Sequence, residues 1–211
     1  MKDKKQGMNL PNKLTVLRII LVPVFIVVMM LPQSVLDWKW SALIGAAIFT
    51  IASLTDMLDG KIARKYNLVT DFGKLMDPLA DKFMVIGALT AIVYRMIDSK
   101  LMLTLFAVAL LVVIFRELAV TSLRLVASSS SGVVVAANML GKIKTVTQIV
   151  CVVAALVEPV IYDSLVFGEA ASWIPKYPPL TITFCALMIV FTVWSGINYF
   201  IGMWKYLDPQ K

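Results

Sequence analysis

The chain reads DMLDGKIAR at residues 56–64 and GKLMDPLAD at residues 73–81, and both stretches lie within long apolar segments. They place four aspartates close together: Asp56, Asp59, Asp77 and Asp81. Burying a charged carboxylate among apolar groups is costly unless a cation or a hydrogen bond compensates it. The two acidic segments therefore indicate a site where cations, most often metal ions, neutralise the carboxylates, and they place that site within a set of apolar helices.

The composition is that of a membrane protein. Of the 211 residues, 60% are hydrophobic and 16% are charged, and the mean hydropathy is +0.86. A soluble domain is about half apolar and a quarter charged. The net charge of +7 suits an anionic membrane surface and anionic substrates. The sequence shows no soluble basic domain of the kind that binds nucleic acid.

Histidine is absent, and this excludes every catalytic or metal-binding arrangement that needs an imidazole. Acid–base chemistry is then expected to use carboxylates. The two cysteines, Cys151 and Cys185, lie within apolar segments and are interpreted as core residues, not as a disulfide.

Hydropathy divides the chain into six expected transmembrane helices of about 20 residues each. They are Leu14–Leu31, Trp40–Arg64, Lys74–Tyr94, Met102–Ala127, Ile143–Tyr162 and Leu180–Tyr206. The expected fold is an all-α integral membrane protein with one six-helix domain over residues 14–206. Residues 1–13 are expected to lie on the cytoplasmic membrane surface and residues 207–211 to form a cytoplasmic tail. No small-residue cleavage site follows the first apolar segment, so it is interpreted as a retained span.

The distribution of basic residues predicts the orientation. Six spans place both termini on one side, and all but four of the 20 Lys and Arg residues belong to that side. The exceptions are Lys39, Arg95, Lys100 and Lys176. The basic side, with the aspartates, is therefore expected to face the cytoplasm.

Three local patterns predict helix ends and connections. Asn12 and Thr15 fit an ordinary helix cap with Asn12 at the boundary. Ser128–Ser131, followed by Gly132, predicts a flexible linker. A group of prolines, Pro175, Pro178 and Pro179, predicts an outer loop before the last span.

The spacing of the acids predicts that they converge. Asp56 and Asp59 are three residues apart and Asp77 and Asp81 are four apart, so each pair shares one helix face. The short connection Lys65–Phe72 makes the two helices antiparallel neighbours. Their acidic faces are therefore expected to meet near the cytoplasmic ends of the helices.

The residues around the acids suit a phosphate ligand. Two divalent ions such as Mg²⁺ or Mn²⁺ would neutralise the carboxylates and polarise phosphate oxygens. Gly60, Ala63 and Gly73 are small enough to let a ligand or a neighbouring helix approach the backbone. Arg64 adds a permanent cation for phosphate or ribose. Lys82 can be structural or can bind phosphate.

The full pattern, D-x₂-D-G-x₂-A-R-x₈-G-x₃-D-x₃-D from Asp56 to Asp81, resembles the signature of the CDP-alcohol phosphotransferase family at every position. The resemblance implies a homodimeric membrane enzyme with two metal ions that transfers the phosphatidyl group of CDP-diacylglycerol to an alcohol and releases CMP. It implies metal binding by Asp56, Asp59, Asp77 and Asp81, with Asp81 also the general base. The implied CDP-binding residues are Asp56, Asp59, Gly60, Ala63, Arg64, Gly73, Asp77 and Asn12.

A second basic group flanks the expected connection between the fourth and fifth spans: Arg116, Arg124, Lys142 and Lys144. The positive-inside rule alone accounts for a single cation here. Four of them around one connection are better explained as a pocket for the phosphate of the acceptor. Glu117 lies seven residues before Arg124, a spacing that fits a structural ion pair between the two.

This basic stretch and NLPNKLTVLR at residues 9–18 resemble the bacterial phosphatidylglycerophosphate synthase branch of the family. The acceptor implied is sn-glycerol 3-phosphate. An inositol phosphate would also use the cations, whereas phosphatidylglycerol has no phosphomonoester and fits less well. Two other classes remain: membrane prenyltransferases, whose acidic motifs usually lie far apart in the chain, and cation transporters, whose acids should lie near the middle of the membrane.

Overall fold

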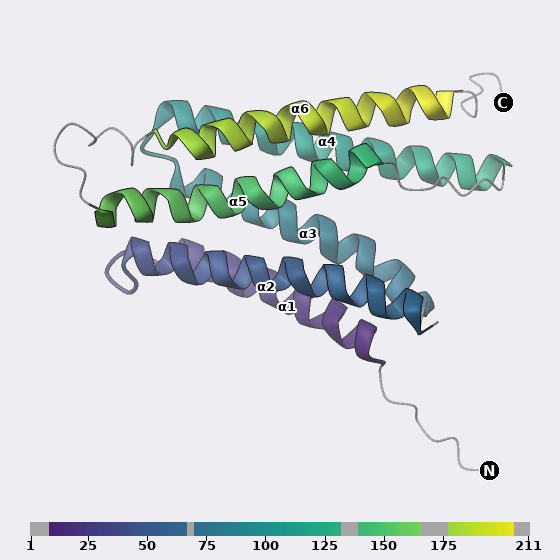
Figure 1. The fold of residues 1–211 in the computed structure, drawn as a ribbon, viewed down its shortest axis with the longest axis horizontal. Coiled ribbons are helices and arrows are strands. Elements are labelled where there is room, and N and C mark those ends of the chain that lie inside the picture. Colours follow the sequence, from purple (N-terminus) through teal and green to yellow (C-terminus); the bar gives the residue numbers. More distant parts are fainter. Residues whose placement is uncertain (1–8, 67–69, 132–138, 166–176, 205–211) are drawn as a thin grey trace, which may run out of the picture. The chain divides into compact units, whose positions relative to one another are not determined.

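The computed structural model describes residues 9–66, 70–131, 139–165 and 177–204. The described residues form six helices, α1 (Leu10–Met30), α2 (Trp38–Lys65), α3 (Asp71–Arg95), α4 (Lys100–Ser131), α5 (Met139–Leu165) and α6 (Pro179–Met203) (Figure 1). The chain divides into two compact units, Met1–Ala91 and Ile92–Lys211. The prediction of an all-α protein with six helices is confirmed for the part of the chain described.

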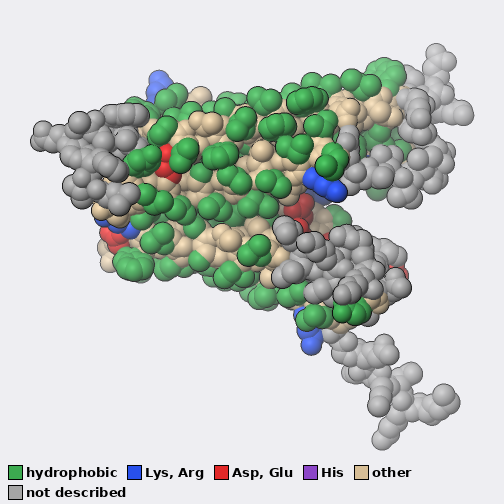
Figure 2. Space-filling view, in the orientation of Figure 1, with side chains coloured by type: hydrophobic (Ala, Val, Ile, Leu, Met, Phe, Trp, Pro, Cys, Tyr) green, Lys and Arg blue, Asp and Glu red, His purple; other side chains and the backbone are tan. Residues whose placement is uncertain are grey.

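The helices have the length and surface of membrane spans. Among the described residues, α1, α2, α4, α5 and α6 are long and apolar enough to cross a membrane by length and composition. Apolar side chains are spread along the described helices on the face shown in Figure 2. Helix α3 is as long as these helices but carries Asp77, Asp81 and Lys82 in its first half, which lowers its hydropathy. The protein is a multi-pass integral membrane protein.

Two helix ends differ from the sequence expectations. Asn9, not Asn12, is the N-cap of α1, because its side chain accepts a hydrogen bond from the backbone N–H of Asn12 at 3.1 Å. Pro11 favours this earlier start, because proline lacks an N–H group and the N–H groups of the first turn have no partner within the helix. The expected linker Ser128–Ser131 is helical and closes α4, because serine lowers helix stability only slightly and a long helix propagates through it.

Some expected features lie outside the described residues. These are residues 1–8 of the surface segment, the tail over residues 207–211, Gly132, Pro175 and residues 67–69 of the connection between α2 and α3. The last two prolines of the expected outer loop are described: Pro178 is the N-cap residue of α6 and Pro179 is its first residue.

Close helix contacts in the first unit depend on glycines. A Cβ added at Gly45 of α2 would lie 2.7 Å from Met29 Sδ of α1, so no larger residue fits there without a shift. A Cβ at Gly87 of α3 would lie 3.1 Å from Val22 of α1. Small residues at such positions let helix backbones approach closely within a membrane. Helix α1 therefore packs tightly against both α2 and α3.

In the second unit, α6 packs against α4 and α5. Cys151 of α5 and Cys185 of α6 are both buried and both free, which agrees with the interpretation of these thiols as core residues. Contact between these helices brings a buried acid of α5, Glu158, to the start of α6.

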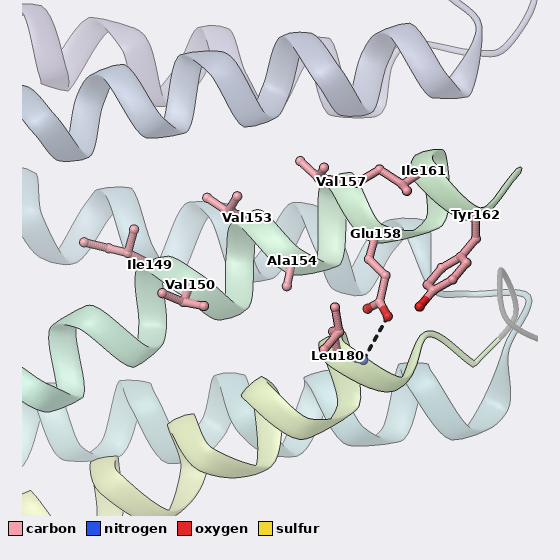
Figure 3. A pocket seen from close by; sticks show the side chains of 9 residues that line it. All are labelled: Ile149, Val150, Val153, Ala154, Val157, Glu158, Ile161, Tyr162 and Leu180. Atoms are coloured by element: carbon pink, nitrogen blue, oxygen red, sulfur yellow. Dashed lines mark hydrogen bonds between the residues drawn. The ribbon is translucent and has the colours of Figure 1, made fainter. Parts of the chain in front are cut away.

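Glu158 caps α6 from a neighbouring helix (Figure 3). Its carboxylate accepts from the backbone N–H groups of Leu180 and Thr181 at 2.8 and 2.6 Å, and from the Thr181 hydroxyl at 2.7 Å. The first N–H groups of a helix lack partners within the helix, and the positive end of the helix dipole favours an anion there. An apolar pocket lies beside this contact, and among the described residues that line it Glu158 and Tyr162 are the polar side chains. Glu158 is 4% exposed, so its charge is compensated by these bonds and not by water.

We expect Glu158→Ala to destabilise the protein by about 1–3 kcal/mol, because it leaves buried N–H donors at the start of α6 without an acceptor. Glu158→Gln keeps one acceptor oxygen and should lose less. Thermal unfolding of the purified protein in detergent measures both variants. Equal melting temperatures for wild type and Glu158→Ala would contradict the capping role.

Candidate active site

The candidate site begins with a polar stripe on α1. Asn12, Thr15 and Arg18 are spaced three residues apart on one face of this otherwise apolar helix, and all three are buried. Side chains three residues apart are neighbours on a helix surface. Each of these three side chains bonds to a residue of α2, of α3 or of the connection between them.

Arg18 binds the first aspartate of the motif. Its Nη1 lies 2.6 Å from Asp56 Oδ1 of α2, and the arginine is 0% exposed. A guanidinium cannot lose its proton in a protein, so it needs an anionic partner when buried. The ion pair therefore compensates the buried guanidinium and fixes one oxygen of the Asp56 carboxylate.

Thr15 binds the third aspartate of the motif. Its hydroxyl donates to Asp77 Oδ1 of α3 at 2.6 Å. Because Thr15 and Arg18 are adjacent on the same face of α1, Asp56 and Asp77 come from different helices to one surface. The predicted convergence of the two acidic segments is supported for these two residues.

Asn12 and Thr70 shape the start of α3. The Thr70 hydroxyl donates to Asn12 Oδ1 at 2.9 Å and accepts from the Gly73 N–H at 3.1 Å, as an N-cap residue does. A Cβ at Gly73 would lie 3.2 Å from Asn12 Oδ1 and 3.6 Å from Asp77 Oδ2. The glycine thus leaves space beside the oxygen of Asp77 that Thr15 does not engage.

A contact between α2 and α3 indicates where Asp81 lies. Ser53 Oγ of α2 is 3.8 Å from Met84 Sδ of α3. Asp56 follows Ser53 by three residues, and Asp81 precedes Met84 by three residues, so both lie one turn nearer the connection between α2 and α3. Because the two helices are antiparallel, Asp56 and Asp81 lie at the same height along their axes. Lys82, beside Asp81, donates to the backbone carbonyl of Pro78 at 3.1 Å, which favours its structural role.

The rest of the motif lies on the last turns of α2. Asp59, Gly60, Ala63 and Arg64 are helical, and the placement of their side chains lies outside what the structure describes. Within the described side chains, no three acidic, histidine or cysteine groups form a metal site. The described donors nevertheless fit a hard divalent cation, because Asp56 and Asp77 both offer carboxylate oxygens. Arg18 fixes the first carboxylate, and the second has an oxygen facing space that a side chain at residue 73 would fill.

The basic residues of the second unit form a network around Glu117. Arg116 Nη1 lies 3.1 Å from Glu117 Oε1, and Lys144 Nζ of α5 donates to the same oxygen. All three side chains are buried. The ion pair expected between Glu117 and Arg124 is therefore wrong: Glu117 turns toward Arg116 and α5, and Arg124 donates to the Tyr199 hydroxyl of α6. Lys142 lies exposed on the first turn of α5.

Sequence reasoning missed several residues of these networks. The sequence predicts only a helix-cap role for Thr15 and gives Arg18 no role beyond the resemblance of residues 9–18, although polar residues at every third position of an apolar helix are a usable signal. Ser195 and Tyr199 of α6, which both bind arginines of α4, carry no such signal. A single serine or tyrosine in a span is common, and only packing shows what it contacts.

Comparison with known proteins identifies the family. Residues 8–194 match the family described as CDP-alcohol phosphatidyltransferase, and the chain belongs to this family. A protein from Bacillus subtilis (strain 168) is 42% identical over 96% of this chain and 99% of its own length. One from Rickettsia bellii (strain RML369-C) is 34% identical over 94% of this chain and 97% of its own. Both are named CDP-diacylglycerol–glycerol-3-phosphate 3-phosphatidyltransferase.

The family generally depends on divalent metal ions. Residues that hydrogen-bond a metal-binding carboxylate and orient it change metal affinity by about 10–100-fold. Thr15 and Arg18 hold two of the acids that the sequence predicts to bind metal.

We expect Thr15→Val to weaken Mn²⁺ binding by about tenfold, because the valine leaves Asp77 without the donor that orients it. Thr104→Val is the matched control, since Thr104 is exposed and bonds only the Lys100 carbonyl of its own helix. Titration of the purified variants with Mn²⁺, followed by electron paramagnetic resonance, measures the free ion. Equal affinities of Thr15→Val and wild type would show that the bond does not serve the metal site.

Proposed function

We propose that this protein transfers the phosphatidyl group of CDP-diacylglycerol to sn-glycerol 3-phosphate, giving phosphatidylglycerophosphate and CMP. The observation that carries the proposal is structural: Asp56 of α2 and Asp77 of α3 are both bonded to one face of α1. The names of relatives aligned over nearly the whole chain support the choice of donor and acceptor.

We assign Asp56, Asp59, Asp77 and Asp81 as ligands of two divalent ions, Mg²⁺ or Mn²⁺. When bound, such ions neutralise phosphate oxygens and make the phosphorus easier to attack. Arg18 and Thr15 hold two of the carboxylates in place, so little reorganisation is needed when a metal ion binds.

Asp81 is the proposed general base. It takes the proton of the acceptor hydroxyl, and the hydroxyl oxygen forms a bond to the phosphorus of the phosphatidyl group. The bond from this phosphorus to the bridging diphosphate oxygen breaks, and CMP leaves with the electron pair. In a chain without histidine, a carboxylate is the expected group for this proton transfer.

The proposed CDP pocket uses the small residues and the arginine of the motif, Gly60, Ala63, Arg64 and Gly73, together with Asp56, Asp59 and Asp77. Asn12 contributes through Thr70. Its Oδ1 accepts a hydrogen bond from the Thr70 hydroxyl, and the same hydroxyl caps α3 by accepting from the Gly73 N–H. The backbone of this first turn is thereby kept close to the space beside Asp77.

We further propose that Arg116, Arg124, Lys142 and Lys144 bind the phosphate of the acceptor. Guanidinium groups bind phosphate through two parallel hydrogen bonds, and lysines add point charges. Glu117 keeps Arg116 and Lys144 together while the site is empty of phosphate, which reduces the repulsion between two buried cations.

In the proposed setting, six helices including α3 cross a bacterial cytoplasmic membrane, with both termini and the aspartates at the cytoplasmic side. The excess of Lys and Arg on that side supports this orientation. A homodimer is proposed from the resemblance to the family.

We expect the purified protein in nanodiscs with Mg²⁺ or Mn²⁺ to release CMP from CDP-diacylglycerol when glycerol 3-phosphate is added. Parallel reactions contain inositol phosphate or phosphatidylglycerol as acceptor, and pyrophosphate is assayed alongside CMP. If glycerol 3-phosphate releases no more CMP than buffer does, the proposal fails. Faster release with another acceptor would keep the chemistry and change the substrate.

We expect Asp81→Asn to lower kcat by about 10²–10⁴-fold, the range typical of general-base catalysis. An amide cannot accept the hydroxyl proton, but it keeps the size of the side chain, so most CDP-diacylglycerol binding should remain. Asp71→Asn, an exposed position at the start of the same helix, is the control. Undiminished kcat in Asp81→Asn would remove this residue as the base.

A further inference from the structure

Tyr199 of α6 contacts both arginines of the basic network on α4. The guanidinium carbons of Arg116 and Arg124 lie 5.5 and 4.9 Å from the centroid of its ring, within the reach of cation–π attraction. The Tyr199 hydroxyl also accepts a hydrogen bond from Arg124 Nη2. Tyr199 is 5% exposed, so these contacts form away from bulk water, where they are strongest.

The same face of α6 supports Arg116 at two more points. Ser195 Oγ accepts from Arg116 Nη2 at 2.7 Å. A Cβ at Gly196 would lie 3.3 Å from Arg116 Cγ, so the glycine lets the stem of the arginine lie against α6. Arg116 Nε is buried and has no hydrogen-bond partner among the described residues, so one donor of this guanidinium is not satisfied by them.

These contacts hold together two arginines that lie far apart along α4. Arg116 and Arg124 are eight residues apart, which separates their Cα atoms by about 12 Å along the helix axis. Two long side chains on one helix have many rotamers, and ordering both when a ligand binds costs conformational entropy. The tyrosine ring is rigid and buried, and it holds both guanidinium groups against one surface before any ligand arrives.

We propose that Tyr199 is a positioning residue for the acceptor phosphate: it orients Arg116 and Arg124 so that both guanidinium groups can bind one phosphate. This inference rests on the proposed function, because it assigns these arginines to the phosphate of glycerol 3-phosphate. It adds α6 to the substrate site, a helix that carries no residue of the aspartate motif.

The test compares steady-state kinetics of two Tyr199 variants. Tyr199→Phe removes the hydroxyl and keeps the ring, and should raise KM for glycerol 3-phosphate about tenfold, the effect of one hydrogen bond to a charged group. Tyr199→Leu also removes the ring, and should raise it further. For both variants, kcat and the KM for CDP-diacylglycerol should stay within about twofold of wild type, a split that general loss of structure would not produce.

Two matched controls test whether the effect belongs to this position. Tyr162→Phe removes a tyrosine hydroxyl from α5, and Phe200→Leu removes an aromatic ring from the next position of α6. Both should leave all kinetic constants near wild type. A double-mutant cycle provides the decisive measurement: in an Arg124→Ala background, Tyr199→Phe should raise KM by less than about twofold, because the hydroxyl acts through Arg124.

The outcomes separate the two proposals. If wild-type protein shows no release of CMP that depends on glycerol 3-phosphate, both the proposed function and this inference fail. If wild type is active and the Tyr199 variants keep its KM for glycerol 3-phosphate, the inference alone is overturned. Equal effects of Tyr199→Phe with and without Arg124 would also overturn it, since the hydroxyl would then act by another route.

Discussion

The structure depends on compensating charge inside apolar helices, and the ion pair between Arg18 and Asp56 is the centre of this arrangement. The guanidinium is fully buried, so it would be strongly unfavourable without the carboxylate 2.6 Å away. One turn earlier, Thr15 donates to Asp77. Helix α1 thus brings an acid from each of two other helices to one surface. In the proposed function, the same bonds that stabilise the packing also orient both carboxylates for metal ions.

The second unit meets the same constraint in two different ways. Glu117 lies between Arg116 and Lys144, so one buried anion holds two cations from different helices. Glu158 has no basic partner among the contacts described for it and is compensated by the N-terminus of α6. The first arrangement gathers the positive charge that the proposed function assigns to the phosphate of the acceptor. The second arrangement satisfies a helix end and serves stability.

The sequence predicts the class of fold correctly, and the convergence of Asp56 and Asp77 is supported by their contacts with α1. The errors of the sequence prediction have local causes. The cap of α1 was misplaced because Asn9 and Asn12 are both good cap residues, and the choice depends on Pro11 between them. The linker at Ser128–Ser131 was predicted from composition, which does not detect that a long helix continues through serines. The pairing of Glu117 with Arg124 followed from spacing on one helix, whereas a neighbouring helix supplied a closer cation.

The sequence by itself determined that this is a helical membrane protein with an acidic motif on two consecutive helices, because hydropathy, helix periodicity and motif spacing are properties of contiguous residues. The tertiary structure alone decided which side chains meet: Arg18 with Asp56, Thr15 with Asp77 and Tyr199 with both arginines of α4. The physical reason is that such pairs depend on the rotation and register of packed helices. These are set by the fit of many side chains at once, which no local pattern encodes.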